Sequence, residues 1–127
     1  MKSWFCWCLV VRVVSALNLK LLILGYGNVG REVSRQTLAD FSKISVTVRQ
    51  IQPASGKESV EMLAWDNEDR VLQAARDCSH CLVTLPATVE SKRCDAIAKV
   101  LSPGTWLGVV SSTSVYGDHQ GAWVTED

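Results

Sequence analysis

The sequence has 127 residues, of which 13 are basic, 13 are acidic and 47% are apolar. This length predicts a single domain, and the composition allows a hydrophobic core. The zero net charge removes the electrostatic argument for a nucleic-acid partner, which needs clustered excess lysine and arginine. Five cysteines without a regular framework argue against a disulfide scaffold and favour a reducing compartment.

A hydrophobic extension, residues 1–18, precedes the predicted domain, which we place over residues 19–127. Lys2 precedes an apolar run, and no acidic residue occurs before Glu32, a composition typical of targeting segments. Arg12 interrupts the run, which is shorter than the roughly 20 residues of a membrane-spanning helix. We therefore expect no transmembrane segment. The expected location is the cytoplasm, or a plastid or mitochondrion if the extension is a transit segment; an extra strand or a misplaced start codon are the alternatives.

From residue 19 onward, short apolar runs alternate with amphipathic stretches. The patterns predict strands over residues 19–25, 44–51, 60–65, 80–86 and 105–112, and helices over residues 28–41, 67–77 and 88–101. Such alternation indicates a parallel sheet with right-handed crossovers. We predict an α/β fold with a Rossmann-type doubly wound sheet of about five strands. No helix follows the last predicted strand, so we expect the fold to be incomplete at its C-terminal end.

The stretch GYGNVG follows the first predicted strand and opens a predicted helix. It matches the G-x-G-x-x-G pattern of dinucleotide-binding loops in the context that the pattern requires. Gly25 would allow a tight turn, Gly27 a close approach of a pyrophosphate, and Gly30 close packing of the helix on the sheet. The amides of Asn28, Val29 and Gly30 would then face the phosphates. The alternative is a glycine turn that binds nothing.

The end of the second predicted strand indicates which dinucleotide is bound. An acidic residue there would bind the ribose 2′-hydroxyl of NAD, whereas an arginine suits the 2′-phosphate of NADP. No acidic residue occurs over residues 44–57, and Arg49 occupies the expected place. We therefore predict NADP as cofactor, with NAD as the second possibility. Arg31 would assist, or is simply exposed, and Arg49 has the alternative of a solvated charge.

Three more candidate positions lie at the ends of the third and fourth predicted strands. Asp66 would lie near an adenine ring, or would instead cap the helix that comes after it. Leu85 and Pro86 end the fourth strand. Because ligands of open parallel sheets bind over the carboxyl ends of the strands, we expect these residues at one common edge with the glycine loop.

Three stretches in this order, LLILGYGNVG, LVTLPA and VVSSTSVYGD, carry a family resemblance. The sequence over residues 19–127 resembles the extended and atypical short-chain dehydrogenases/reductases. The nearest group is the NAD(P)-dependent epimerase/dehydratase-like proteins, some of them sugar-nucleotide epimerases. The resemblance implies a nicotinamide dinucleotide, a sugar-nucleotide or other small carbonyl or alcohol substrate, and a possible homodimer.

In that family, a serine or threonine four residues before the tyrosine of the YG pair hydrogen-bonds the reacting oxygen of the substrate. The corresponding residue here is Ser112, and Ser111 and Thr113 flank it beside the expected nicotinamide position. A hydroxyl can donate and accept, so it can orient an alcohol or a carbonyl during hydride transfer. The alternative is a polar turn after a strand.

The same family uses a Tyr-x-x-x-Lys pair as its general acid/base, in which the lysine lowers the pKa of the tyrosine. Tyr26 is followed four residues later by Gly30, and Tyr116 by Gln120, so neither tyrosine has its lysine. We interpret the chain as the cofactor-binding front half of such a protein and expect no turnover from it alone.

Two other motifs indicate alternative functions, a sensing domain and a metal or redox site. LILGYGNVGRE also resembles the NAD-sensing regulatory domains of potassium channels and transporters, although these carry an acidic residue after the second strand and have no place for SSTSVYG. Cys78 and Cys81 form a C-x-x-C pair, but a structural zinc site needs four ligands. We interpret them as buried free cysteines and expect no metal site.

Overall fold

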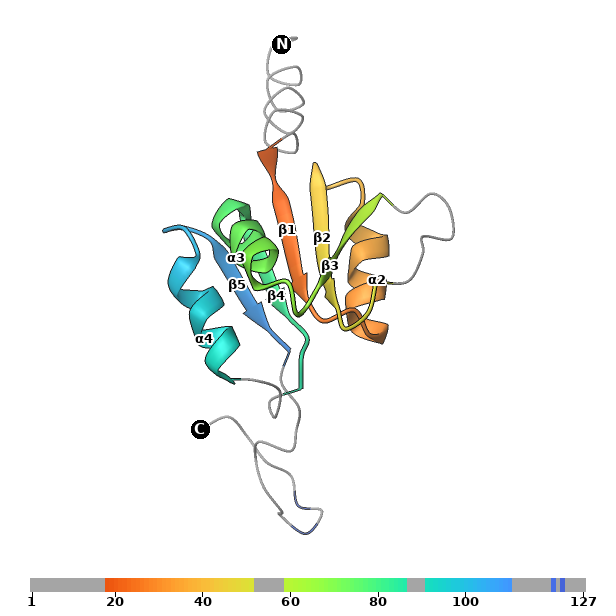
Figure 1. The fold of residues 1–127 in the computed structure, drawn as a ribbon. Helices are drawn as coiled ribbons and strands as arrows, with labels where there is room; N and C mark the ends of the chain where they lie inside the picture. The colour runs from red at the N-terminus through yellow and green to blue at the C-terminus, as the bar shows by residue number, and fades with distance from the viewer. Residues whose placement is uncertain (1–17, 52–58, 87–90, 111–119, 121, 123–127) are drawn as a thin grey trace, which may run out of the picture.

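The computed structural model describes residues 18–51, 59–86, 91–110, 120 and 122. These residues form one sheet of five strands, all parallel, in the order β3-β2-β1-β4-β5 (Figure 1). The elements in chain order are β1 Lys20–Leu24, α2 Asn28–Thr37, β2 Lys43–Val48, β3 Val60–Ala64, α3 Glu68–Asp77, β4 His80–Val83, α4 Ser91–Val100 and β5 Trp106–Val109.

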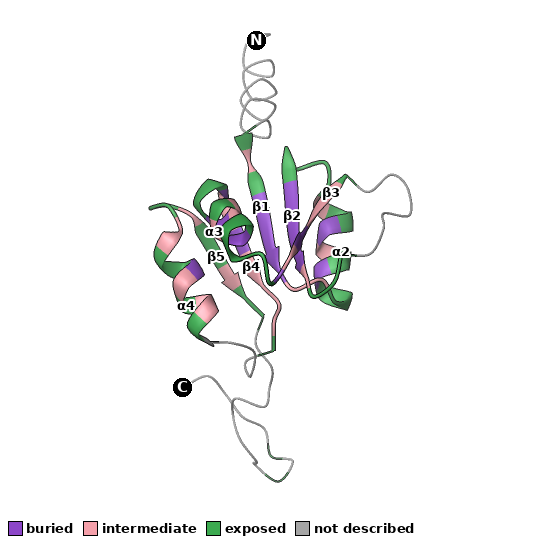
Figure 2. Cartoon of the chain, viewed as in Figure 1, coloured by how far each residue is buried: buried purple, intermediate pink, exposed green. Residues whose placement is uncertain are grey.

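Helices cover both faces of this sheet. α2 contributes to the core on one face, whereas α3 and α4 pack on the other. Successive residues of a strand point to opposite faces, so β1 supplies both cores: Leu22 and Leu24 face α3 and α4, and Leu21 and Ile23 face α2. Figure 2 shows β1 and β2 as the most deeply buried strands. The predicted parallel, doubly wound α/β architecture with five strands is therefore confirmed for the described residues.

The buried face of α2 differs from the one that the sequence indicated. Val29, Val33 and Leu38 recur at helical spacing in the sequence, but Val29 is 48% and Leu38 is 42% exposed, and of the three only Val33 packs against the core. Gly30 and Ser34, one turn apart, are the buried residues instead. Small side chains let the helix approach the sheet closely, and the Ser34 hydroxyl is satisfied within the helix by donating to the Arg31 carbonyl at 2.8 Å.

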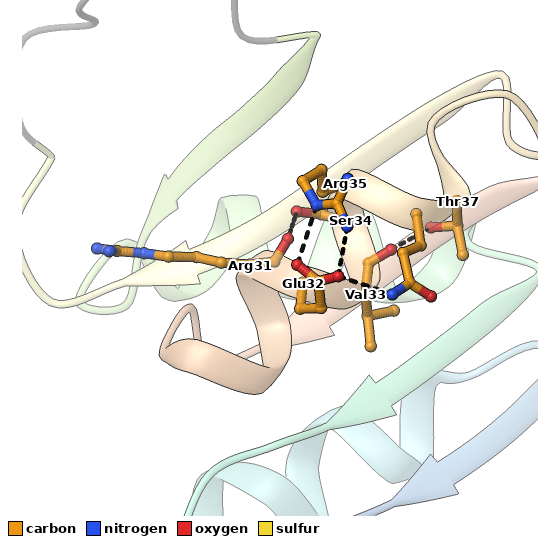
Figure 3. A network of polar contacts seen from close by, with 7 residues as sticks. Arg31, Glu32, Val33, Ser34, Arg35 and Thr37 are labelled. Atoms are coloured by element: carbon orange, nitrogen blue, oxygen red, sulfur yellow. Dashed lines mark hydrogen bonds and ion pairs between the residues drawn. The ribbon is translucent and has the colours of Figure 1, made fainter.

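The exposed face of α2 carries an ion-pair network of its own. Glu32 accepts hydrogen bonds from Arg35 at 2.5 and 2.9 Å and from Gln36 at 2.7 Å. The Arg31 side chain extends away from this network (Figure 3), and its guanidinium lies 5.6 Å from the centre of the Tyr26 ring. Arg31 is therefore not bound by the nearest acid of its own helix.

β5 pairs with β4 on one side only and is an edge of the described sheet. Its apolar side chains are poorly covered: Trp106 is 52%, Leu107 49% and Val109 65% exposed. The predicted strand over residues 105–112 ends earlier, at Val109, and its last two residues lie outside the described residues.

Candidate functional site

The loop from β1 to α2 begins with Gly25, whose φ of +103° lies in the left-handed region that L-residues with side chains avoid. A Cβ atom at this position would come 2.7 Å from the Thr84 Oγ1 and 3.1 Å from a methyl of Leu85. Backbone conformation and packing therefore both require glycine where the chain leaves the sheet.

Gly27 and Gly30, the other glycines of the motif, have opposite surroundings. Gly27 precedes α2 with an extended backbone, and a Cβ there would meet no atom within 4 Å. A Cβ on Gly30 would lie 2.5 Å from the carbonyl oxygen of Gly25. Gly30 is thus needed for packing the helix against the turn, whereas Gly27 borders open space into which a ligand can approach the backbone.

The start of α2 leaves backbone donors without partners in the helix. The first helical hydrogen bond runs from the Arg31 N–H to the Gly27 carbonyl at 3.0 Å. The N–H groups of Asn28, Val29 and Gly30 precede it, no side chain caps them, and no acidic residue lies in the first turn. These amides and the positive end of the helix dipole form a surface suited to an anion.

Other predicted site residues follow β2, β3 and β4. Arg49 follows β2, Asp66 follows β3, and Leu85 and Pro86 follow β4. All strands are parallel, so these positions lie at the same carboxyl edge as the Gly25 turn (Figure 1). Arg49 is exposed and makes no ion pair with any described residue. Leu85 lies close to Gly25. Contacts of these four residues with a ligand remain a prediction.

The alternative role of Asp66 as a helix cap is wrong. Asn67 caps α3, since its side-chain oxygen accepts a hydrogen bond from the Arg70 N–H at 3.3 Å. The Asp66 side chain is exposed at the carboxyl edge, which keeps it available to a ligand. Ser111, Ser112 and Thr113 lie outside the described residues.

Three side-chain hydrogen bonds near this edge were not predicted from the sequence. The hydroxyls of Thr47 and Thr84 hydrogen-bond the backbone of Gly25 from the neighbouring strands. On the other face, Arg93 of α4 donates to the Trp65 carbonyl at 2.6 Å, and its guanidinium lies 4.9 Å from the centre of the Trp65 ring. For the two threonines, the only sequence signal was a β-branched polar residue near the end of a buried strand, and β-propensity alone explains such a residue equally well.

The C-x-x-C cysteines lie in the core and not at this edge. Cys78 is 5% exposed and donates to the Ala75 carbonyl at 3.3 Å, and Cys81 is fully buried in β4. The hydrogen bond with Cys78 and burial both raise the pKa of the Cys81 thiol, so it stays protonated at neutral pH. Both cysteines are free, as is Cys94.

Potential metal ligands do not cluster in the described part of the chain. It contains no group of three or more His, Cys, Asp or Glu residues with a geometry that could hold a metal ion. The same residues include no helix with the length and apolar character needed to cross a bilayer.

Solved structures with the same architecture include proteins of several activities. A 2-hydroxyacid dehydrogenase from Ketogulonicigenium vulgare Y25 matches with a TM-score of 0.55 and 23% identity over 72% of this chain. RSP, a Rex-family repressor, in complex with β-NADH matches with a TM-score of 0.54 and 13% identity over 88% of this chain. The methyltransferase MycE of the mycinamycin biosynthetic pathway, in complex with Mg and SAH, matches with a TM-score of 0.55 and 12% identity over 88%.

The fold is of the Rossmann type. The strand order β3-β2-β1-β4-β5 corresponds to the first five strands of the Rossmann order 3-2-1-4-5-6. This chain spans 27% of the dehydrogenase, 63% of RSP and 32% of MycE. No protein-family model and no curated protein matches the sequence. At these identities the likeness establishes the fold alone.

Proposed function

We propose that this chain is a nicotinamide-dinucleotide-binding domain that binds the pyrophosphate of its cofactor at the start of α2. The geometry of Gly25, Gly27 and Gly30 is the observation on which the proposal rests: a left-handed turn off the central strand, open space beside Gly27, and close packing of Gly30. Each glycine has the property that the dinucleotide motif requires of it. The uncapped amides of the first helical turn supply the donors.

The other candidate residues indicate where the two halves of the cofactor would lie. The adenosine half would lie over the ends of β2 and β3, beside Arg49 and Asp66. The nicotinamide half would lie over the ends of β4 and β5, beside Leu85, Pro86 and Ser111. This arrangement follows the rule that ligands of open α/β sheets bind at the carboxyl ends of the strands, where the strand order reverses.

We propose NADP as the preferred cofactor. Arg49 is exposed after β2 and has no ion-pair partner among the described residues, so its charge is free to bind a 2′-phosphate. No acid occupies this end of β2 to select the 2′-hydroxyl of NAD. Arg31, which lies on the first turn of α2 and is directed away from Glu32, would be a second cation for the same group.

A finer proposal concerns the kind of protein. On the resemblance of SSTSVYG, we propose an epimerase/dehydratase-like short-chain dehydrogenase whose cofactor domain covers residues 19–127 and whose Ser112 orients a small carbonyl, alcohol or sugar-nucleotide substrate. Because no Tyr-x-x-x-Lys pair occurs in the sequence, the chain alone is expected to show no turnover.

A second candidate is a sensing domain that binds the dinucleotide without chemistry. The likeness to RSP with bound β-NADH, over 88% of this chain, favours it. The nucleotide sequence downstream of the codon for Ser112 distinguishes the two candidates. An open reading frame there that encodes Tyr-x-x-x-Lys indicates an enzyme, and the absence of this pair favours the sensor.

A titration with NADPH, NADH and S-adenosylmethionine tests the ligand class. We expect NADPH to bind most tightly. Arg49→Gln should weaken NADPH binding about 10-fold, the worth of one charge-assisted hydrogen bond, and leave NADH binding unchanged. Arg76→Gln, an exposed arginine at the end of α3, is the matched control. A folded chain that binds neither nicotinamide dinucleotide at millimolar concentration, or binds only S-adenosylmethionine, refutes the proposal.

A further inference from the structure

Gly25 has no regular place in the sheet, because its left-handed backbone turns the chain away from β1. Its peptide groups nevertheless need partners, since unpaired backbone groups inside a protein are costly. Two threonine side chains from the strands on either side of β1 supply these partners.

Thr47, near the end of β2, bonds the amide side of the turn. Its Oγ1 accepts a hydrogen bond from the Gly25 N–H at 2.8 Å. Thr47 is only 2% exposed, so water does not compete for this bond. The β-branched side chain of threonine has few rotamers, which keeps the oxygen aimed at the turn.

Thr84, directly after β4, bonds the carbonyl side. Its backbone N–H donates to the Leu24 carbonyl at 2.9 Å, and its Oγ1 lies 3.1 Å from the carbonyl oxygens of both Leu24 and Gly25. The same Oγ1 would lie 2.7 Å from a Cβ at position 25. Thr84 thus bonds the turn and also fills the space that the missing side chain leaves.

The carbonyl that Thr84 bonds is the one against which α2 packs. The Gly25 oxygen would lie 2.5 Å from a Cβ on Gly30, so the first turn of the helix rests directly on it. A shift of this carbonyl therefore moves the amides of Asn28, Val29 and Gly30. Since a pyrophosphate needs several donors aligned at once, a small shift weakens binding strongly.

We propose that Thr47 and Thr84 are positioning residues for dinucleotide binding. Thr47 in β2 and Thr84 directly after β4 hold the two peptide groups of Gly25, an arrangement that we call the clamp. The clamp thereby orients the first-turn amides of α2. This inference rests on the proposed function of the glycine loop. Neither threonine touches the ligand in this scheme, and both act through the backbone of Gly25.

The test uses paired substitutions. Thr47→Val and Thr84→Val keep the shape of the side chain and remove the hydroxyl, whereas Thr47→Ser and Thr84→Ser keep the hydroxyl. Thr37→Val is the matched control, because the Thr37 hydroxyl bonds the Val33 carbonyl at 2.8 Å at the far end of α2. We expect each of the two valine variants of the clamp to weaken NADPH binding about 10-fold. The serine variants should stay within about twofold of wild type, and Thr37→Val should bind unchanged.

Amide hydrogen exchange of the ligand-free protein tests the clamp without using the ligand. In wild type, the Gly25 N–H should exchange at least about 10-fold more slowly than the Asn28 N–H, which has no partner in the helix, after correction for intrinsic rates. Thr47→Val should accelerate exchange at Gly25 and leave the amides of β4 unchanged. This measurement on wild type stands even if a valine variant fails to fold.

The outcomes separate the two proposals. If wild type binds no dinucleotide, the proposed function fails, and fast exchange at Gly25 would refute the clamp on its own. If NADPH binds and the clamp variants bind it as wild type does, the positioning role is refuted. Equal losses in Thr37→Val would also refute it, because they would show a general effect of stability.

Discussion

The two helices that follow β1 and β3 start in opposite ways. α2 and α3 both have ten residues and both end with an arginine in the last turn. At its start, α3 has an Asn67 cap bonded to the Arg70 N–H, and Glu68 and Asp69 in the first turn. α2 has Gly27 at its cap position, so no side chain caps it, and no acid lies in its first turn. The difference between the two helices is thus concentrated in their first turns.

This difference shows which helix is complete by itself. In α3, the chain supplies the acceptor and the negative charges that the free amides and the helix dipole favour, contributing about 1 kcal/mol for the cap and up to about 1 kcal/mol for each charge. In α2 the same contributions are missing, at a position where the backbone also borders open space. Under the proposed function, the pyrophosphate of the cofactor would supply them.

The largest effect is expected for Gly30→Ala. Alanine favours helices by up to about 1 kcal/mol over glycine, so a loss of stability would have to come from packing. The new Cβ would lie 2.5 Å from the Gly25 carbonyl, and we expect a loss of about 1–3 kcal/mol in the free energy of unfolding, together with loss of dinucleotide binding. Urea unfolding measures it. Gly27→Ala, with open space around its Cβ, is the control and should change stability by less than about 1 kcal/mol. Equal stability of the two variants would contradict the packing role of Gly30.

Gly27→Asp would make the start of α2 resemble that of α3. The backbone at Gly27 is extended and its surroundings are open, so an aspartate fits and can cap the free amides. We expect stability to stay equal or rise by a few tenths of a kcal/mol, while NADPH binding falls at least about 10-fold because the carboxylate competes with the pyrophosphate. Calorimetric titration and thermal unfolding measure both. Unchanged NADPH binding in a stable variant would show that the ligand lies elsewhere.

Asn67→Ala tests the other helix. Removal of the cap should lower the free energy of unfolding by about 1 kcal/mol, and dinucleotide binding should change less than in Gly27→Asp because the Asn67 side chain bonds its own helix. Asn28→Ala, in the first turn of α2, is the comparison variant and should have the smaller effect on stability. The comparison of the two helices would be wrong if both substitutions destabilised the chain equally.

The smallest effect is expected for the stability of the fold at acidic pH. Partial burial raises the pKa of Glu61, but the hydrogen bonds from Lys43 and Ser45 and the charge of Arg70 outweigh it, so the pKa lies below its ordinary value. A carboxyl with a lowered folded-state pKa stabilises the fold fully above its ordinary pKa of 4.5, and this stabilisation is lost as the pH falls through the folded-state value. The hydrogen bond from Arg35 lowers the pKa of Glu32 to about 2, so the stabilising contribution of Glu32 is likewise lost in acid.

Unfolding by urea at neutral pH and below pH ~4 measures this contribution. We expect Glu61→Gln to lower stability at neutral pH and to reduce the loss of stability on acidification. Dinucleotide binding should stay unchanged, because Glu61 pairs with Lys43 at the start of β2, away from the carboxyl edge. An identical pH dependence in wild type and variant would contradict the lowered pKa.

The order of elements could be predicted from the sequence, but several of their ends could not. All eight predicted strands and helices of the described region are present. The second and fourth predicted strands extended to Ile51 and Pro86, but the strands end at Val48 and Val83. Apolar and β-branched residues continue past the last ladder pair, and only the partner strand decides where pairing stops. These overextended ends are the positions that line the carboxyl edge.

The site shows the same division. Separate roles could be predicted for Gly25, Gly27 and Gly30. Their spacing in the motif alone indicates a tight turn, a close approach of a pyrophosphate to the backbone and close packing of the helix. The buried face of α2, the choice of Asn67 as cap and the hydrogen bonds of Thr47 and Thr84 could not. The two threonines are separated from Gly25 by 22 and 59 positions along the chain, and no local pattern reports such contacts.

Local chemistry thus sufficed for the features that depend on neighbours in the chain: the alternation of strands and helices, the glycine turn and the missing acid after β2. The tertiary structure decided which side chains hold that turn in place, because a hydroxyl in a buried strand finds its partner only when β1 lies between β2 and β4.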